Sequence, residues 1–407
     1  DNFFLILIYL IPPLILTGPF LPDLFLSILS LSFLIYIFVK KKFYLLNLRF
    51  SKFFLLFYLY LIFSSFLSSD ILYSLRDSLF YIRYLFFTLA IYYLAKKFVF
   101  FPINFGYILL FCAVLLAFDI VFESIFGHNI FGWERLNGYR VSSFFGDELI
   151  AGSVLQRLAV ACICLLISFY KLDLKKYFIY FSLLILFSIV VYLTGERVAF
   201  FNMLIFICLF TFILFRLSFL RIAPFILIYP IILIINKLFP YVNHRMSTLL
   251  DIQLSKTSFP FLPYTLSHEY IYTSALKMFF DNFLFGVGPN LFSVKCSISK
   301  YFVEFGCSTH AHNYYIHLLA ETGIIGFLFL FLFFLFVAIK ILFKFLSNYN
   351  LFNIKFISIS TTIFYCYYFI EFFPIKPSGN FFANHLNVMI YIPMGFLLYF
   401  HYKSEDS

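Results

Sequence analysis

Apolar residues fill most of the chain in long runs, which short polar segments separate. A helix needs roughly 20 largely apolar residues to cross a bilayer, and these runs have about that length. The runs lie at 3–18, 20–39, 52–69, 78–95, 100–122, 149–170, 177–194, 198–215, 222–239, 320–345, 351–372 and 385–402. This pattern predicts an all-α integral membrane protein with about 12 transmembrane helices.

A long polar stretch, residues 240–313, separates the ninth run from the tenth. We therefore divide the chain into residues 1–239 with helices 1–9, the loop 240–313, and residues 314–407 with helices 10–12, all within a single membrane domain. The composition agrees with this division, because 63% of the residues are hydrophobic and only 12% are charged. Such a balance excludes an ordinary soluble domain.

Lysine and arginine lie mostly in the loops that follow even-numbered runs, for example Lys40, Lys42, Lys96 and Lys97. Because basic loops tend to stay in the cytoplasm, both termini are expected there and residues 240–313 are expected outside. The formal net charge of +10 is therefore a topology signal and does not indicate a nucleic-acid partner.

Two cysteines, Cys296 and Cys307, lie in the polar loop, whereas the other five lie in apolar runs. An extracytoplasmic loop faces an oxidising compartment, where disulfides persist. We expect a disulfide between Cys296 and Cys307; the alternative is two reduced thiols packed apart.

Three arginines lie within or at the ends of apolar runs, and a charge at membrane depth is usually paired or functional. Arg197 is either functional or a helix-end residue that reaches the interface. Arg157 lies deeper and is expected to be functional or to pair with Asp147 or Glu148. Arg83 is expected to be a snorkelling or structural residue.

His310 and His312 precede the tenth run. Positions i and i+2 do not share a helix face, and no third ligand stands at a recognisable spacing, so no metal site is expected. His312 fits a general base, a hydrogen-bond donor to an anion, or a loop histidine packed at the interface. Glu321 either orients His312 or caps its own helix, and Gly323 and Gly326 would allow the close approach of another helix.

The sequence HAHNYYIHLLAETGIIG at residues 310–326 resembles the signature of the bacterial O-antigen ligase and polymerase family. The family pattern is a histidine and a polar residue, nine residues, a glycine, two residues, and then a small residue or tyrosine. Further agreement comes from FFGDELIAGSVL (144–155), TGERVAF (194–200), DNFLFGVGPNLF (281–292) and PIKPSGNFFAN (374–384).

The resemblance implies a membrane glycosyltransferase of the bacterial inner membrane that acts on its periplasmic face. A saccharide would move from an undecaprenyl diphosphate donor to a sugar hydroxyl, with Arg197 and His312 as catalytic residues. Guanidinium groups suit the departing diphosphate, and an imidazole can deprotonate the hydroxyl or help to hold the diphosphate. Substrate binding is expected of Arg140, Arg245, His268, Asn313 and Glu321. Family members often carry an arginine at the position of His268. Either another cation such as Arg245 takes the role of that arginine, or this chain works without such a residue.

Several alternatives remain at this point. The outer loops contain no Asp-x-Asp element and the chain has no P-loop, so neither a metal-bound nucleotide-sugar donor, nor ATP, nor a cofactor is expected. A polymerase, with a chain-length regulator as a further candidate partner, is favoured over a ligase acting on the lipid A core. A transporter or flippase would use Arg197 and Arg157 along a substrate path, but the internal repeats typical of transporters are not found. A purely structural scaffold leaves the motif agreement unexplained.

The distribution of basic residues makes the topology testable. Reporter fusions near residues 98 and 173 should give cytoplasmic signals, and a fusion near residue 260 should give an extracytoplasmic signal, because basic loops are retained inside. A cytoplasmic signal near residue 260 would contradict the placement of the long loop and of every candidate site residue in it.

Overall fold

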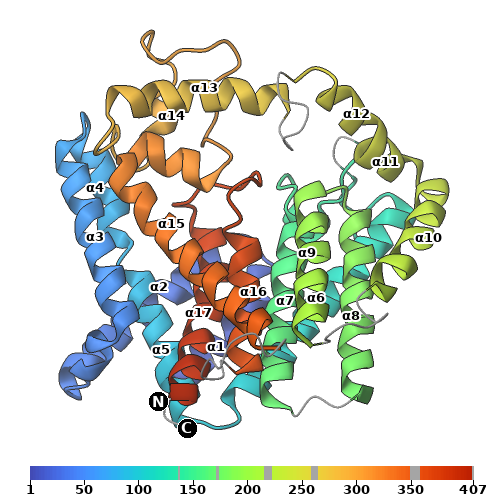
Figure 1. Cartoon of the computed structure of the whole chain (residues 1–407), viewed down its shortest axis with the longest axis horizontal. Coiled ribbons are helices and arrows are strands. Elements are labelled where there is room, and N and C mark those ends of the chain that lie inside the picture. The colour runs from blue at the N-terminus through green and yellow to red at the C-terminus, as the bar shows by residue number, and fades with distance from the viewer. Residues whose placement is uncertain (136–137, 171–173, 215–221, 258–264, 349–357, 406–407) are drawn as a thin grey trace.

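The computed structural model describes residues 1–135, 138–170, 174–214, 222–257, 265–348 and 358–405. This part of the chain folds into helices without strands, as Figure 1 shows, so the predicted all-α class is confirmed. Residues 351–357 of the run 351–372, and the fusion points near residues 173 and 260, lie outside the described residues.

The long helices follow the apolar runs closely. They are α1 (Asn2–Ile15), α2 (Phe20–Val39), α3 (Arg49–Leu67), α4 (Ile71–Phe80), α5 (Arg83–Lys97), α6 (Phe101–Phe126), α7 (Ala151–Phe169), α8 (Leu174–Leu193), α9 (Arg197–Leu214), α10 (Ala223–Leu238), α15 (Tyr314–Asn348), α16 (Ile359–Glu371) and α17 (Asn384–Glu405). Between α10 and α15 lie α11 (Pro240–Asn243), a π-helical turn (His244–Thr248), α12 (Leu249–Leu254), α13 (Leu266–Asp281) and α14 (Phe292–Lys295). Short 3-10 helices occupy Phe43–Asn47 and Ser143–Phe145. Each predicted run overlaps at least one of the long helices, and the run 78–95 extends over the end of α4 and most of α5.

Among the described residues, eight helices are long and apolar enough to cross a membrane. They are Phe20–Val39, Arg49–Leu67, Ile71–Lys97, Phe101–Phe126, Ala151–Phe169, Lys175–Leu193, Arg197–Leu214 and Tyr314–Ser347. The number becomes nine if α10 and the segment Pro240–Leu254, which bend by 112° at their junction, form one span. The chain is thus a multi-pass membrane protein, and the number of twelve spans stays a prediction.

The two ends of the helix bundle differ. Figure 1 shows both chain termini at one end, while α13 lies across the opposite end. The segment from α10 through α12 reaches this opposite end at one side of the bundle, and α14 and the start of α15 leave it at the other. Which end faces the cytoplasm stays a prediction of the basic-residue pattern.

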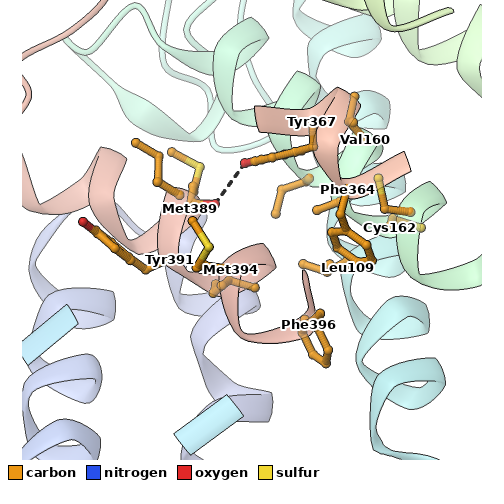
Figure 2. Close-up of a cluster of buried hydrophobic side chains, with 14 of the residues drawn as sticks. Leu109, Val160, Cys162, Phe364, Tyr367, Met389, Tyr391, Met394 and Phe396 are labelled. Carbon is orange, nitrogen blue, oxygen red and sulfur yellow. Dashed lines mark hydrogen bonds between the residues drawn. The ribbon is translucent and has the colours of Figure 1, made fainter. Parts of the chain in front are cut away.

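Apolar side chains from α6, α7, α16 and α17 meet in the core drawn in Figure 2. Pro393 lies inside α17 and has no N–H group, so the carbonyl of Met389, four residues earlier, has no helical donor. The hydroxyl of Tyr367 donates to that carbonyl at 3.0 Å, and Tyr368 donates to the carbonyl of Ile390 at 2.7 Å. Because lipid offers no hydrogen bonds, α16 supplies, through Tyr367, the donor that the proline in α17 removes.

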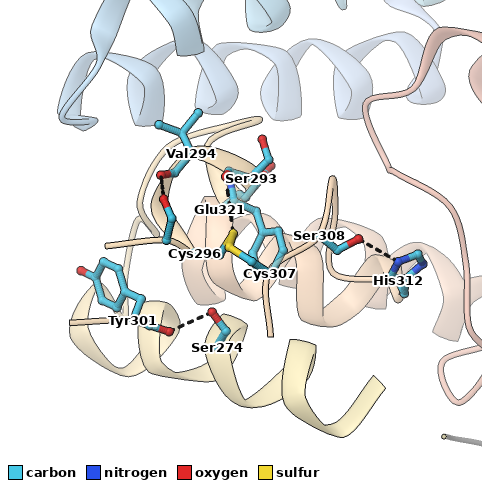
Figure 3. Close-up of a disulfide and its surroundings, with 11 residues drawn as sticks. Ser274, Ser293, Val294, Cys296, Tyr301, Cys307, Ser308, His312 and Glu321 are labelled. Atoms are coloured by element: carbon cyan, nitrogen blue, oxygen red, sulfur yellow. Dashed lines mark hydrogen bonds between the residues drawn. A yellow bond between two sulfur atoms is a disulfide. The ribbon is translucent and has the colours of Figure 1, made fainter. Parts of the chain in front are cut away.

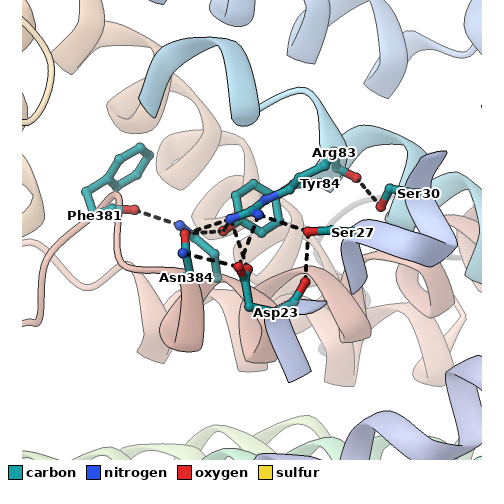
Figure 4. A network of polar contacts seen from close by, with 8 residues as sticks. Asp23, Ser27, Ser30, Arg83, Tyr84, Phe381 and Asn384 are labelled. Atoms are coloured by element: carbon teal, nitrogen blue, oxygen red, sulfur yellow. Dashed lines mark hydrogen bonds and ion pairs between the residues drawn. The ribbon is translucent and has the colours of Figure 1, made fainter. Parts of the chain in front are cut away.

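Arg83 lies at the start of α5 and forms a polar network with α2 and α17, which Figure 4 shows. Its guanidinium group lies 2.9 Å from a carboxylate oxygen of Asp23 and donates to Asn384 at 2.7 Å and to Ser27 at 3.0 Å. The charge is therefore satisfied inside the protein, which supports the structural interpretation of Arg83.

Helix α15 is broken at Gly323, where φ is 62° and ψ is −167°. The carbonyl of Ala320 would normally accept from Ile324 but instead accepts from the N–H of Val287 at 2.9 Å. The N–H of Ile324 in turn donates to the carbonyl of Phe283 at 2.9 Å. The loop around Gly-Val-Gly-Pro therefore replaces the helical hydrogen bonds that the break removes.

Glycine is needed on both sides of this contact, since the two backbones touch. A Cβ on Gly286 would lie 2.3 Å from the backbone of Glu321, and one on Gly323 would lie 2.3 Å from a carbonyl oxygen of the facing loop. A Cβ on Gly326 would lie 3.2 Å from the ring of Tyr60 in α3. A backbone does approach closely at Gly323, but it belongs to a loop and not to another helix. At Gly326 the nearest atom outside α15 belongs to the side chain of Tyr60.

We expect Gly286→Ala to lower the thermal unfolding temperature well below that of Gly132→Ala. Both glycines have positive φ, 70° and 84°, but only Gly286 faces backbone, whereas no atom lies within 4 Å of a Cβ on Gly132. The control should lose about 1–2 kcal/mol from the left-handed conformation alone. Gly286→Ala adds a backbone clash and broken hydrogen bonds. Equal losses in the two variants would show that the loop does not brace the break in α15.

Candidate functional site

Two cavities adjoin each other in the structure. The first encloses about 780 Å³ and is lined in part by His310 and His312; we call it the histidine cavity. The second encloses about 590 Å³ and is lined in part by Arg197, Arg245 and His268; we call it the arginine cavity. Both cavities are lined by Arg140, Glu196, Val198, Asn202, Lys376 and Pro377, which form their common wall.

Most of the predicted site residues meet here. Arg140, Arg197, Arg245, His268 and His312 line one or both cavities. Asn313 and Glu321 lie outside both. The two predicted catalytic residues, Arg197 and His312, therefore lie in neighbouring cavities rather than in one.

The common wall depends on a contact between two of the motif stretches. The Glu196 carboxylate accepts hydrogen bonds from the N–H groups of Gly152 and Ser153, at 2.7 and 3.1 Å, at the start of α7. A Cβ on Gly152 would lie 2.4 Å from the hydroxyl of Thr194, so only glycine allows this approach. Burial raises the pKa of Glu196, while Arg140, 3.8 Å away, and the two N–H donors oppose this shift. Glu196 is a helix cap that holds Arg140 in the wall.

Arg197 is the first residue of α9 and connects it to the segment after α10. Its guanidinium group donates to the carbonyl oxygen of Arg245 at 2.6 and 3.2 Å and to the side chain of Gln253 at 2.7 Å. The carbonyl of Arg245 belongs to the π-helical turn. Arg197 thereby places a second cation, Arg245, in the same cavity.

Three histidines come together across the two cavities. The ring centroids of His310 and His312 are 4.1 Å apart, and those of His268 and His312 are 5.8 Å apart. Burial lowers the pKa of His268 to about 4 and that of His310 to about 3, and it also lowers the pKa of His312. Within the described residues, no group of three or more His, Cys, Asp or Glu is placed to hold a metal ion. At neutral pH these imidazoles are uncharged and can accept a proton.

The segment that carries His312 is held on both sides. Cys296 and Cys307 form a disulfide with Cα atoms 5.2 Å apart, shown in Figure 3, so the expected pairing is present in the structure. The next residue, Ser308, places its hydroxyl 3.1 Å from Nε2 of His312. The carbonyl of His312 accepts from the N–H of Ser378 at 2.8 Å. The backbone φ of His312 is 51°, a conformation that a non-glycine residue rarely adopts.

Asn313 is a buried connector with 1% of its surface exposed. Its amide nitrogen donates to the carbonyl oxygens of Pro374 and Lys376, at 2.7 and 3.1 Å. Its oxygen accepts from the N–H groups of Tyr315 and Ile316, at 2.9 and 3.1 Å, and so caps the start of α15. The side chain makes four hydrogen bonds within the protein, which suits a positioning role.

Glu321 pairs with a histidine, but not with the expected one. Its carboxylate lies 2.9 Å from Nε2 of His317, one helical turn away, and not against His312. It also accepts from the N–H groups of Asn290 and Phe292, at 2.6 and 2.8 Å. The expectation that Glu321 orients His312 is therefore wrong, because its oxygens are used to hold the loop that braces the break in α15.

Arg157 has a partner that the local sequence did not indicate. It forms two hydrogen bonds with Glu371 of α16, at 2.7 and 3.1 Å, so the expected pairing with Asp147 or Glu148 is wrong.

Sequence reasoning also missed Lys376, which is 9% exposed and lines both cavities. The sequence signal that could have identified Lys376 is its position within the motif stretch 374–384.

Residues 181–331 match a family model described as O-antigen ligase. The match supports the resemblance to the O-antigen ligase/polymerase family that the sequence motifs indicate. The matched range includes Arg197, Arg245, His268 and His312 of the cavities as well as the break at Gly323. No curated protein matches the chain. The O-antigen ligase family match and the apolar helices together indicate a membrane enzyme of polysaccharide biosynthesis.

We expect Asn313→Ala to lower the free energy of unfolding by about 2–4 kcal/mol, since a helix cap is worth about 1 kcal/mol and buried groups left without partners cost about 1–3 kcal/mol. Ser358→Ala is the matched control, because the Ser358 side chain caps α16 through one N–H, that of Thr361. Its loss should be about 1 kcal/mol. Thermal unfolding of the purified protein in detergent measures both. A loss in Asn313→Ala no larger than in the control would contradict its connecting role.

Proposed function

We propose that the protein transfers a saccharide from an undecaprenyl diphosphate donor to a sugar hydroxyl on the outer face of the cytoplasmic membrane. One observation carries the proposal: cationic side chains and neutral histidines from separate segments converge on two cavities with a common wall. A lipid-linked diphosphate supplies its own activation, so the reaction needs neither ATP nor a nucleotide sugar.

The linings of the cavities suggest which substrate each one takes. The arginine cavity also contains apolar residues, among them Phe201, Ile205, Leu250 and Leu254, which suit a prenyl chain. The histidine cavity contains polar residues such as Ser153, Gln156, Ser378 and Asn380, and also Trp133, which suit a saccharide. We assign the donor lipid to the arginine cavity and the acceptor sugar to the histidine cavity.

Arg197, Arg245 and Arg140 are assigned to the diphosphate. As the bond between the sugar C1 and the diphosphate oxygen breaks, negative charge grows on the leaving group. Guanidinium groups placed beforehand in a partly buried site stabilise that charge more in the transition state than in the ground state. Arg245 is then the cation that replaces the arginine expected at position 268.

His312 is assigned as the general base. It takes the proton from the acceptor hydroxyl while that oxygen forms its bond to C1, and the proton then passes to water. Burial lowers the pKa of His312, which keeps the imidazole neutral and favours this role over that of a charged anion ligand.

Polymerization of a surface polysaccharide is the activity that we place first, and ligation to the lipid A core is the alternative, because the matched family is described as O-antigen ligase. Lipopolysaccharide ladders from a strain lacking the gene separate the two. A single repeat unit on the core would indicate a lost polymerase. Free core together with accumulated lipid-linked polymer would indicate a lost ligase.

We expect Arg197→Ala to reduce glycosyl transfer by about 100–1,000-fold, as is typical when a stabiliser of a developing anion is removed. His312→Ala should reduce it by about 100–10,000-fold through the loss of the base. Arg197→Lys keeps the charge but loses the planar fork that binds phosphate in two places, so it should remain well below wild type. The measurement is the polymer formed by each variant in the deletion strain, normalised to protein abundance.

Arg83→Ala is the control for this experiment. Arg83 contacts Asp23, Ser27 and Asn384 away from the cavities, so its loss should lower abundance more than turnover per molecule. Near-normal polymer from abundant Arg197→Ala and His312→Ala proteins would reject the assigned mechanism.

A further inference from the structure

The charges next to the common wall do not cancel. Arg157 and Glu371 are paired by two hydrogen bonds, and the hydroxyl of Tyr314 lies 3.5 Å from the same carboxylate. The nearby Lys376 adds a second positive charge to this group of buried residues. Within the part of the chain that the structure describes, its ammonium group makes no hydrogen bond and no ion pair. One buried positive charge is therefore left without a direct partner, which is costly unless a ligand supplies the anion.

The other acidic residue of the wall is also occupied. Glu196 accepts two backbone hydrogen bonds from α7 and lies beside Arg140, so its carboxylate is not available to Lys376. The remaining titratable and charged residues that line the two cavities are Glu148, Arg157, Arg197, Arg245, His268, His310, His312 and His385. Cations outnumber carboxylates in this lining, which favours an anionic ligand.

Lys376 is held in place by the same residue that starts α15. The amide of Asn313 donates to the carbonyl oxygen of Lys376 at 3.1 Å, and the neighbouring carbonyl of His312 accepts from Ser378 at 2.8 Å. The position of Lys376 is thus coupled to that of His312, and among the described residues that line either cavity the lysine carries the only ammonium group.

We propose that the ammonium group of Lys376 binds a phosphate group of the substrate at the boundary between the two cavities. This inference rests on the proposed function, in which the anion is the diphosphate of the donor lipid. Lys376 then holds the diphosphate where the donor of the arginine cavity meets the acceptor of the histidine cavity. Burial lowers its pKa to about 8, with Arg157 adding to this shift and Glu371 opposing it, so that the ammonium stays charged at neutral pH.

Pyrophosphate is the probe for this site. Calorimetric titration of the full-length protein in detergent should show at least about tenfold weaker binding in Lys376→Met than in wild type, because a buried charged contact is lost. Lys376→Arg should retain most of the affinity. Lys300→Met is the control, since Lys300 is an exposed lysine paired with Asp281 outside both cavities. Undiminished binding by Lys376→Met, or no binding of pyrophosphate by the wild type, would overturn the proposal.

Stability separates a binding role from a structural one. Without ligand, Lys376→Met should unfold at or above the wild-type temperature, because an uncompensated buried cation is replaced by an apolar side chain of similar length. Glu371→Gln should unfold at a lower temperature, because it leaves Arg157 buried without a carboxylate. A marked loss of stability in Lys376→Met with unchanged pyrophosphate affinity would assign Lys376 to the pairing of Glu371 instead.

The pH dependence gives an independent readout. Between pH 7 and 9 the affinity of wild type relative to Lys376→Arg should fall, since the lysine loses its proton near pH 8 and arginine does not. The comparison cancels the ionisation of pyrophosphate, and His268 and His310 are already neutral over this range. A constant ratio would contradict the proposal.

The two hypotheses can fail separately. If Lys376→Met binds pyrophosphate normally while Arg197→Ala and His312→Ala abolish transfer, the role of Lys376 is wrong and the proposed function stands. If Lys376→Met loses binding while the Arg197 and His312 variants make normal polymer, the anion site stands and the proposed reaction is wrong.

Discussion

The arrangement of the candidate site depends on the side chain of Asn313. One buried amide caps the first turn of α15 and also holds the carbonyls of Pro374 and Lys376, which precede α17 by several residues. An amide is suited to this position because it offers two donors and an acceptor in one plane. An aspartate at position 313 would lack the N–H donors, and a leucine would lack the donors and the acceptor. The residues on either side of this connection, His312 and Lys376, are the ones that face the cavities.

A second constraint acts on the other side of His312. The break at Gly323 would leave carbonyl and N–H groups without partners in a helix surrounded by apolar side chains. The loop at 283–288 provides those partners, and Glu321 holds the loop through the N–H groups of Asn290 and Phe292. The short sequence between His312 and Gly326 therefore also serves the architecture of α15, which explains why several of its polar residues face away from the cavities.

Charge compensation divides the buried ionisable residues into two kinds. Arg83 and Arg157 have carboxylate partners and hold helices together. Arg197 donates to the carbonyl of Arg245 and to the amide of Gln253, which are uncharged, and Lys376 has neither a hydrogen bond nor an ion pair in the described part of the chain. Structural ion pairs are neutral as a unit, whereas a site for a diphosphate must keep an excess of positive charge. The excess lies at the common wall of the two cavities.

The sequence by itself determined the helical class, the approximate positions of the long helices, the pairing of Cys296 with Cys307, and five residues that line the cavities. Each of these follows from a local property: the length of an apolar run, the compartment of a loop, or a short motif. The tertiary structure alone decided that Arg157 pairs with Glu371, 214 positions later, that Glu321 faces His317, and that Lys376 stands between the cavities. Helical periodicity indicates which residues share a face of one helix, but it does not indicate which helices become neighbours. Those partners depend on how α7, α15 and α16 pack against one another, and so no local pattern contained them.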